Sequence, residues 1–533
     1  MNTTQLTVNP ENLVKNLRFS FTQATTVLGE LMQNSRRAGA TSVSFDYVEA
    51  TRLLTVRDNG CGIDSLATLL TVAESGWNAD IIEREQPYGV GFLSALFSCE
   101  FIHVESNGWC FSAATKDLLS FKPVTIKPVV DWNGITTITL QGFKPEAQQI
   151  ENHLQRLAKG FPISVILNSV PLERTRALDA GLQFVNTEIG QVYLNGLSNE
   201  ENWLHLCPYF HLYLQGLPVY HSDEERYFGH IVHLDSARFH ARLPDRDKLI
   251  DEADVVAEVK RILQREARQK LEQLKQQLQP PAYAEGYETL KAYRCLDLLN
   301  DVPVLPKQVL AFVQDFPIME GCDAFNLGTY EQPVTQEDVL TGKVNIAELD
   351  DFDSVGAARW MFAWHRDLLI YRSRLDAGHW LLNHLVDLNA QAVRIEIIGE
   401  THRASFQGQW VEAEAVFCEQ YRLTIGDACV VIENDALYDE DGCLFIVPKG
   451  DASGAVVGQA SSYHDEWYSF NESIKEADEW AFQNFVIANT SVDPAQALQR
   501  LLPSFNSCPA LFAKRFQLEL NESGQIAAVV EIR

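Results

Sequence analysis

Two glycine-rich turns stand beside regular elements within the first hundred residues of the chain. The first, Asp58 to Gly62, directly follows a stretch in which Leu54 and Val56 alternate with polar residues, a pattern typical of a half-buried strand. The second, Gly89 to Gly91, opens an apolar helix that runs through Phe97. Glycine lets the backbone turn sharply and approach another group closely. The pattern predicts strands and helices that leave bare backbone available to a ligand.

A helix is predicted over residues 22–38, because an apolar stripe repeats there at helical spacing and Gly39 follows it. Glu30 and Asn34 are four residues apart and therefore lie on one edge of this helix. A carboxylate there can orient and deprotonate an attacking water. An amide oxygen one turn away can ligate Mg²⁺. Taken alone, the pair is also typical of an ordinary polar helix edge.

The turns and one later strand offer groups that suit a nucleotide. Asp58 can accept a hydrogen bond from the exocyclic amine of adenine, which would select ATP over GTP. The backbone N–H groups of Gly89 and Gly91 can cradle phosphate oxygens at the positive end of a helix. Thr136 lies in the predicted strand 134–140, and its hydroxyl can reach water on the adenine side. Each of these segments alone is a common turn or strand.

In this order along the chain, the four segments resemble the signature of the GHKL ATPases, the superfamily of gyrase, heat-shock chaperones, histidine kinases and MutL. The segment from Glu30 to Thr41 is similar to the MutL motif. The segments V-A-E-S-G-W at 72–77 and Y-G-V-G-F-L-S-A at 88–95 more closely resemble the ninety-kilodalton heat-shock chaperones, as does F-P-I at 161–163. The resemblance covers residues 15–275.

The resemblance implies a GHKL (Bergerat-type) α/β sandwich that binds ATP and Mg²⁺, followed by a transducer-like α/β domain. Glu30 would be the general base, Asn34 the magnesium ligand and Asp58 the adenine contact. Phosphates would be bound by Gly89 and Gly91. Further nucleotide contacts are expected from Gly60, Gly62, Ile63, Ser75, Val90, Phe92 and Thr136. The polar segment between the two turns is expected to form a lid, with Trp77 as a packing anchor.

A later loop extends the resemblance, and residue 37 departs from it. The loop from Leu243 to Ile250 resembles the chaperone loop that delivers a cation to the γ-phosphate, so Arg246 and, second, Lys248 are the catalytic candidates. The same loop is also typical of charged residues that merely precede a helix. Relatives commonly carry Asp where this chain has Arg37. An arginine there could contact a phosphate or point to solvent, and solvent is the favoured prediction.

The sequence predicts four domains. The ATP-binding domain is expected over 1–150 and the transducer-like domain over 151–280, where a long charged helix ends at Pro280-Pro281. A mainly helical acidic region is expected over 281–390, with a Leu-rich helical stretch at 287–315. An α+β domain of unknown role is expected over 391–533.

Composition limits the function classes. The formal net charge is −29, and residues 281–533 hold 17 Lys and Arg against 39 Asp and Glu, a net of −22. Such a field repels polyanions and disfavours DNA as a partner. No long apolar run or secretory signal is present, and ten scattered cysteines without a C-x-x-C pair favour reduced thiols in the cytoplasm. Six histidines between His205 and His240 lack the spacing of a closed metal site.

The leading hypothesis is a Mg²⁺-dependent ATPase that works as an ATP-gated dimeric clamp on protein partners, similar to a chaperone. The alternative is a MutL- or MORC-like clamp that encloses DNA in repair, mobile-element or phage-defence biology. A third class is a binding module with a vestigial pocket. A histidine kinase is disfavoured, because no helical phospho-acceptor region precedes Glu30 and no membrane segment is predicted.

Overall fold

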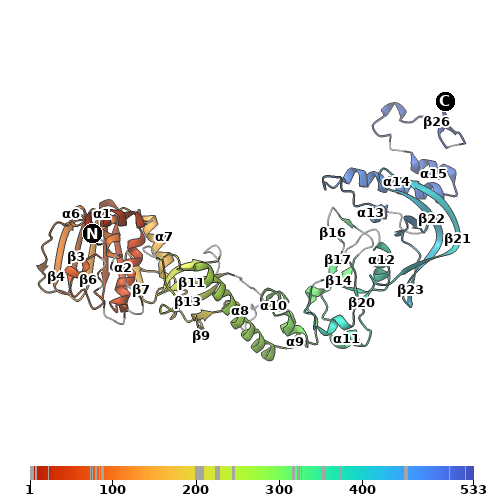
Figure 1. The fold of residues 1–533 in the computed structure, drawn as a ribbon. Helices are drawn as coiled ribbons and strands as arrows, with labels where there is room; N and C mark the ends of the chain where they lie inside the picture. Colours follow the sequence, from red (N-terminus) through yellow and green to blue (C-terminus); the bar gives the residue numbers. More distant parts are fainter. Residues whose placement is uncertain are drawn as a thin grey trace, which may run out of the picture. The chain divides into compact units, whose positions relative to one another are not determined.

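The chain is a mixed α+β protein, as predicted, and contains several sheets (Figure 1). In the computed structural model it divides into two compact units, Met1–Gln279 with Glu288–Cys295, and Pro280–Tyr287 with Leu296–Arg533. The finer division into four domains stays a prediction. The structure describes residues 5, 9–21, 23–72, 74, 76–77, 81–82, 85, 89, 91–197, 209–222, 229–242, 247–314, 319–320, 324–325, 327–350, 356–372, 374–448, 454–502, 505–522 and 524–532.

The first unit contains an eight-stranded sheet in the order β5-β4-β3-β6-β2-β1-β7-β8. Its strands are β1 (Ser42–Val48), β2 (Leu53–Asp58), β3 (Phe101–Ser106), β4 (Trp109–Ala114), β5 (Lys127–Pro128), β6 (Thr136–Gln141), β7 (Ser164–Leu167) and β8 (Val170–Pro171). Strand β7 pairs in parallel with β1, so the sheet extends past residue 150, where the first domain is predicted to end.

One face of this sheet is covered by helices, because alternate strand residues are apolar and point to the same side. The helices are α1 (Pro10–Leu17), α2 (Thr26–Arg37), α3 (Leu66–Leu69), α5 (Gly91–Ser98), α6 (Thr115–Leu118) and α7 (Ala147–Ala158). Apolar residues of α2, α5 and α7 share one core with inward residues of the sheet such as Phe45, Val56 and Leu140. Helix α2 is buried over most of its length.

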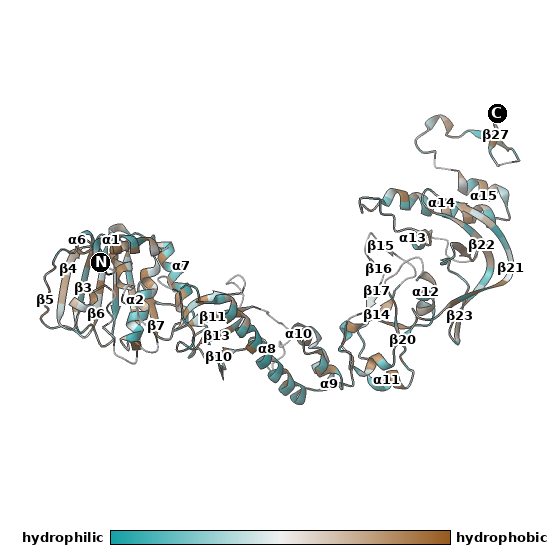
Figure 2. Cartoon of the chain, viewed as in Figure 1, coloured by the Kyte–Doolittle hydropathy of each residue, from teal (hydrophilic) through white to brown (hydrophobic). Residues whose placement is uncertain are grey.

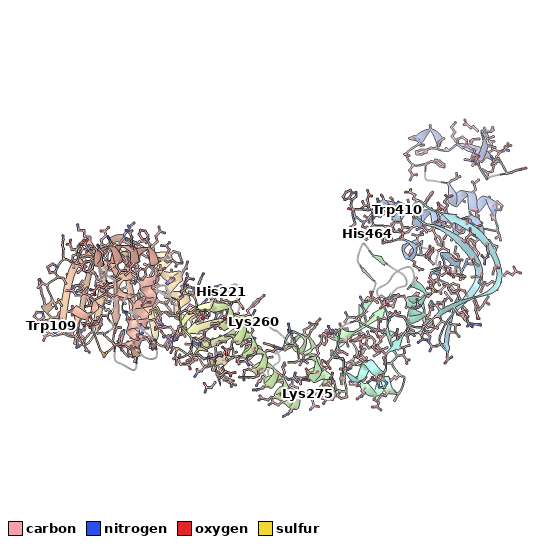
Figure 3. The ribbon with its side chains drawn as sticks, in the orientation of Figure 1. Trp109, His221, Lys260, Lys275, Trp410 and His464 are labelled. Carbon is pink, nitrogen blue, oxygen red and sulfur yellow. The ribbon has the colours of Figure 1, made fainter. Side chains whose placement is uncertain are left out.

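The second sheet of the first unit has the order β12-β11-β13-β10-β9. Its strands are β9 (Val185–Thr187), β10 (Gly190–Tyr193), β11 (Phe210–Leu214), β12 (Leu217–His221) and β13 (His230–Leu234). The long helix α8 (Glu252–Gln277) buries Val259 and Ile262 against it. Its outer face is hydrophilic and carries the exposed Lys260 (Figures 2 and 3).

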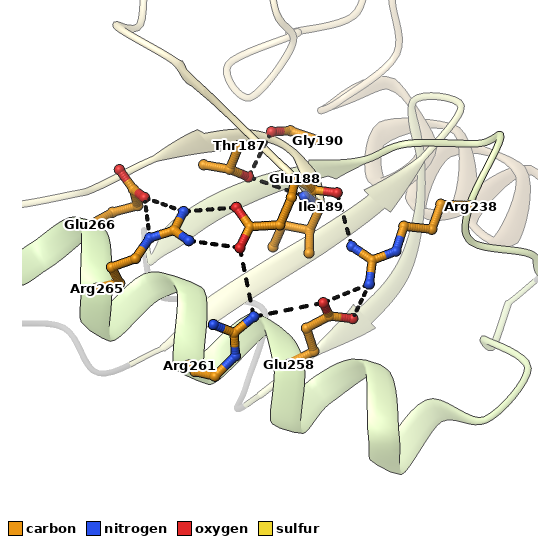
Figure 4. Close-up of polar contacts among 9 residues, drawn as sticks. All are labelled: Thr187, Glu188, Ile189, Gly190, Arg238, Glu258, Arg261, Arg265 and Glu266. Carbon is orange, nitrogen blue, oxygen red and sulfur yellow. Dashed lines mark hydrogen bonds and ion pairs between the residues drawn. The ribbon is translucent and has the colours of Figure 1, made fainter.

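A charge network fixes α8 to the β9–β10 turn (Figure 4). Glu188 in the turn receives two hydrogen bonds from the Arg265 guanidinium, at 2.6 and 2.8 Å. Arg238 binds both carboxylate oxygens of Glu258 on α8, at 2.6 and 2.9 Å. The hydrogen bonds from Arg265 lower the pKa of Glu188 to about 2. The turn is thus held to the helix by paired charges, in addition to the apolar contacts beneath.

The second unit contains a five-stranded sheet, a second sheet built on a long hairpin, and a C-terminal hairpin. The first has the order β17-β14-β19-β18-β20, with β14 (Leu310–Val313), β17 (Leu327–Thr329), β18 (Ile346–Glu348), β19 (Leu369–Tyr371) and β20 (Val386–Asp387). The second pairs β21 (Val393–Gln407), β22 (Glu412–Ile425), β25 (Cys443–Ile446) and β24 (Leu437–Tyr438), with β23 (Ala428–Ile432) beside β22. The remaining strands are β15 (Met319–Glu320), β16 (Ala324–Phe325), β26 (Arg515–Leu520) and β27 (Ile526–Ile532).

Short helices accompany these sheets. They are α9 (Pro280–Ala284), α11 (Gln336–Leu340), α12 (Ala357–His365), α13 (Val457–Ala460), the longer α14 (Glu472–Thr490) and α15 (Pro494–Leu501), whereas α10 (Tyr287–Ala292) lies almost wholly in the first unit. Within α14 the buried Asp478 carboxylate accepts backbone N–H groups of Gln409, Trp410 and Val411, and also the Tyr463 hydroxyl. This one carboxylate therefore fixes the β21–β22 turn to α14.

The predicted helical stretch 287–315 is wrong in its second half. Strand β14 occupies its end, and the chain after η3 (Leu296–Leu299) is not a continuous helix. Pro303 and Pro306 explain the difference, because proline removes a helical hydrogen bond and clashes with the preceding turn. The region 281–390 contains short helices together with a five-stranded sheet that the sequence analysis did not predict.

The charge network gives a pH-dependent prediction. The lowered pKa of Glu188 means that its contribution to stability is present above the ordinary value of 4.5 and is lost as the pH falls toward about 2. Glu188→Gln is therefore expected to speed amide exchange in α8 at pH 7, and to differ little from the unaltered protein near about pH 2. Hydrogen exchange measured by mass spectrometry at both pH values tests this.

The matched control is Glu272→Gln, which removes a carboxylate from the same helix. Its partner Arg268 lies on the same helix, four residues away, with 3.0 Å between Nε and the carboxylate, so this ion pair is within α8. If Glu272→Gln accelerated exchange as much as Glu188→Gln, the network would have no special role in docking the helix.

Candidate functional site

Helix α2 supports the first two site candidates. Glu30 is buried, 5% exposed, and Asn34 is half-buried one turn further on. A Cβ placed on Gly91, the first residue of α5, would collide with the carboxylate of Glu30. The glycine at residue 91 therefore lets the start of α5 lie against the Glu30 side chain in its present position. The structure brings Glu30 and Gly91 together.

The Asp58 turn packs against the end of the same helix. Asp58 Oδ1 accepts the Gly60 N–H at 2.9 Å, and the Cys61 N–H donates to the Ala38 carbonyl at 2.8 Å. A Cβ on Gly60 would lie 2.6 Å from the Ala38 Cβ, closer than side chains tolerate. The second glycine, Gly62, has φ 82°, in the region that glycine occupies readily. Both glycines of this turn are thus required by the backbone.

Asp58 and Thr136 are direct partners on the neighbouring strands β2 and β6. The Ser106 hydroxyl lies 2.8 Å from the Thr136 hydroxyl and accepts the Ile63 N–H at 2.9 Å. A Cβ on Gly62 would lie 3.2 Å from the same Ser106 oxygen. Ser106 therefore joins the turn to β6. The sequence analysis missed Ser106, which stands at a strand end with no distinguishing motif.

The Asp58 carboxyl has a raised pKa. Burial is the main cause, and hydrogen bonds from the Gly60 N–H and the Ser35 hydroxyl offset it only in part. A carboxylate in this setting gains from a further donor, since burial has removed some of its solvation. The Asp58 carboxylate can therefore accept a hydrogen bond from an N–H group of a ligand.

Glu30 also lines a cleft of about 1100 Å³. It is lined by the start of α2, by α7, by β12 and by the loop that leads into α8. Glu30 and Lys248 both line it, so the structure brings these two candidates to one cavity. Asn34, Asp58 and Thr136 are not among its lining residues. Gly91 is also not among its lining residues, although the Gly91 backbone lies against the Glu30 carboxylate.

The other predicted site residues are placed as follows. Gly89 has φ 65°, and Phe92 is buried in the core beneath the sheet. Trp77 is half-buried. Ser75, Val90 and Arg246 lie outside the described residues.

The prediction that Arg37 points to solvent is wrong. Its side chain is only 2% exposed, and its Nε lies 2.8 Å from Glu85 in the segment between the two glycine turns. Its guanidinium also donates to the Gln215 side chain at 3.4 Å, in the β11–β12 turn. Gln33 donates to the Gln215 carbonyl at 3.0 Å. Helix α2 is thus tied to the second sheet on the same edge that carries Arg37.

Glu85 joins two arginines. Arg36 Nη2 lies 2.5 Å from the same Glu85 oxygen that Arg37 contacts. Burial alone would raise the pKa of Glu85, but the hydrogen bonds and charges of Arg36 and Arg37 outweigh it and hold the pKa below its ordinary value. Glu85 is therefore a carboxylate kept ionised by two cations at the end of α2.

The histidines of the second sheet make ordinary structural contacts. His230 is buried and its pKa falls to about 4 because of burial. Its ring accepts the Asn195 N–H at 3.0 Å and lies 2.6 Å from the Tyr293 hydroxyl. His233 stacks on Tyr213. Within the described part of the chain, no group of three or more His, Cys, Asp or Glu side chains is arranged to hold a metal ion.

Comparison with known proteins gives no relative. No protein-family model matches the chain, and no curated protein is significantly similar to it in sequence. Among the helices that the structure describes, none combines the length and apolar character needed to cross a lipid bilayer.

The Arg37 contacts give a stability prediction. Arg37→Ala is expected to lower the free energy of unfolding by about 3 kcal/mol, because it removes one partner of a buried ion pair and leaves a gap beside Gln215. Arg36→Ala is the matched control, since its side chain contacts the same carboxylate but is 19% exposed, and it is expected to cost about 1 kcal/mol. Urea unfolding of both variants measures the difference. Equal costs would show that burial of Arg37 contributes nothing.

Proposed function

We propose that this chain is a Mg²⁺-dependent ATPase of the GHKL type, which works as an ATP-gated dimeric clamp on protein partners. The observation that carries the proposal is the position of Glu30. Its carboxylate lies against Gly91 at the start of α5, and Glu30 also lines a cleft together with Lys248. A general base, a bare phosphate-binding backbone and a cation are the three parts that phosphoryl transfer to water requires.

The adenine end of the proposed site is supported by the Asp58 cluster. Asp58 would accept the exocyclic amine of adenine, which suits a carboxyl whose burial is incompletely offset by hydrogen bonds. Gly62 would lie against the base, because its backbone has no side chain to hold the ring away. Thr136 and Ser106 would fix the turn through the hydrogen bonds that join β6 to Ile63.

The residues around Glu30 fit a magnesium nucleotide. Asn34 offers a neutral oxygen one turn from Glu30 and is half-buried, so a cation shared with phosphate oxygens could reach it. When bound, Mg²⁺ would neutralise charge on the phosphates. Glu30 would hold a water and accept its proton. Lys248 would offer positive charge from the cleft side, and the Gly91 N–H at the start of α5 would face anionic oxygens.

Turnover of Mg·ATP by the full chain tests the proposal. Glu30→Gln keeps the shape of the side chain but removes the base, so it is expected to lower kcat by about a hundredfold or more with ATP affinity retained. Asp58→Ala is expected to weaken ATP binding by about tenfold to a hundredfold, because a charged hydrogen bond to the base is lost. Steady-state hydrolysis and calorimetric binding measure the two effects separately.

Glu49→Gln, an exposed glutamate at the far end of β1, is the control and should change neither value. Normal hydrolysis by Glu30→Gln would show that Glu30 is not the base. Binding of ATP without turnover by the unaltered chain would instead favour a binding module. Retention on long DNA only with ATP and at low salt would favour the DNA clamp.

A further inference from the structure

The second unit displays aromatic rings to solvent in one short loop. His464 and Phe470 form an isolated β-bridge, and the chain between them makes the aromatic loop, residues 464–470. Its tip carries Trp467 and Tyr468, which are 79% and 89% exposed. Large rings are costly to leave in water, and Trp and Tyr are the residues that most often anchor protein interfaces.

The aromatic loop is held in shape by its own carboxylate. Asp465 Oδ1 accepts the N–H groups of Trp467 at 2.8 Å and Ser469 at 2.9 Å, and the Asp465 N–H donates to the Ser469 carbonyl at 3.0 Å. Tyr468 has φ 59°, which is uncommon for a bulky side chain. These bonds fix the two exposed rings on a formed loop.

The aromatic surface continues onto the β21–β22 turn. Tyr463, next to the loop, stacks on Trp410 with ring centres 5.8 Å apart and planes 8° from parallel. Trp410 is 40% exposed, and its backbone is fixed by Asp478. Figure 3 labels Trp410 and His464 in this part of the second unit. The exposed rings of Trp410, Trp467 and Tyr468 therefore stand on two segments that contact each other, the β21–β22 turn and the chain of the aromatic loop.

Acidic side chains are close in sequence to the rings of the aromatic loop. Glu466 lies in the aromatic loop and is exposed. Helix α14 begins two residues after Phe470, and its exposed stripe carries Glu472, Glu476 and Trp480, spaced four residues apart. Residues 454–502 hold seven Asp and Glu against two Lys and Arg. A partner with negative charge, such as a nucleic acid or an anionic membrane, would be repelled here.

We propose that the aromatic loop and the exposed stripe of α14 bind a cationic segment of a partner protein, rich in arginine or lysine. Guanidinium and ammonium groups are attracted to the faces of Trp and Tyr rings. The carboxylates around the rings steer such a segment toward the surface and repel acidic competitors. The surface lies within the second unit and does not depend on the proposed ATPase activity.

The test uses the full chain and three fluorescein-labelled peptides of one sequence, in which a single set of positions is arginine, lysine or uncharged citrulline. Anisotropy titrations are expected to show binding of the arginine and lysine peptides and much weaker binding of the citrulline peptide. Trp467→Ala with Tyr468→Ala is expected to weaken the arginine peptide roughly tenfold, because two cation–π contacts are lost. Replacing both residues by Phe keeps the rings and should restore most of the affinity.

Trp109→Ala is the control, since Trp109 is an exposed ring on the first unit and its removal should change nothing. Circular dichroism establishes that each variant is folded. The proposal is overturned if the double alanine variant binds like the unaltered chain, because surface acidity alone would then explain binding. It is also overturned if no peptide binds, if citrulline binds equally well, or if a neutral oligosaccharide binds in place of the cationic peptides.

Discussion

Close approach of other backbone segments to helix α2 is the constraint on which the first unit depends. Gly29 faces Leu157 of α7 and Leu217 of β12, Glu30 touches the start of α5, and the Asp58 turn lies against Ala38 at its end. A Cβ on Gly91 or Gly60 would crowd the last two contacts, whereas a Cβ on Gly29 would meet only ordinary van der Waals distances. A helix buried on so many sides holds its polar edge in one position. The orientation of Glu30 and Asn34 is therefore set by packing, before any ligand arrives.

Carboxylates that join elements are stabilised in two ways. In the first unit, Glu85, Glu188 and Glu258 are each matched by arginines across elements, so acidic groups hold the parts together. In the second, the buried Asp478 is satisfied by backbone N–H groups instead. Such a carboxylate needs no cation, because several aligned N–H dipoles stabilise its charge. The acidic surplus of this half can then remain on the surface, where it is available to a partner of opposite charge.

The local patterns of the chain predict much of the fold near the site. The apolar stripe of α2, the alternation in β1 and β2 and the glycine turns are each encoded by neighbours in sequence, and the structure contains these elements. The helix beyond Pro280 could not be extended to residue 315, because proline interrupts the leucine pattern. Strand β7 joins the sheet by pairing with β1, where Ser42 lies beside Ser164, 122 residues later in the chain. No local sequence signal encodes this pairing.

The candidate site was predictable only in its local parts. Glu30, Asn34 and Asp58 stand out by residue type and spacing, whereas Ser106 is recognisable only once β3 lies beside β6. Arg37 was assigned to solvent because its partners, Glu85 and Gln215, are 48 and 178 residues away.

The Gln215–Gly216 turn links the two sheets of the first unit, because it belongs to the second sheet and contacts both α2 and Pro162. Both residues hold left-handed angles, and Pro162 Cδ lies 2.5 Å from where a Cβ on Gly216 would stand. Because this turn is tightly packed, a movement of the second sheet is transmitted through it to its neighbours. A tilt of the second sheet would therefore strain α2 at Gln33, and a substitution far out in that sheet would shift the position of Glu30 without contacting it.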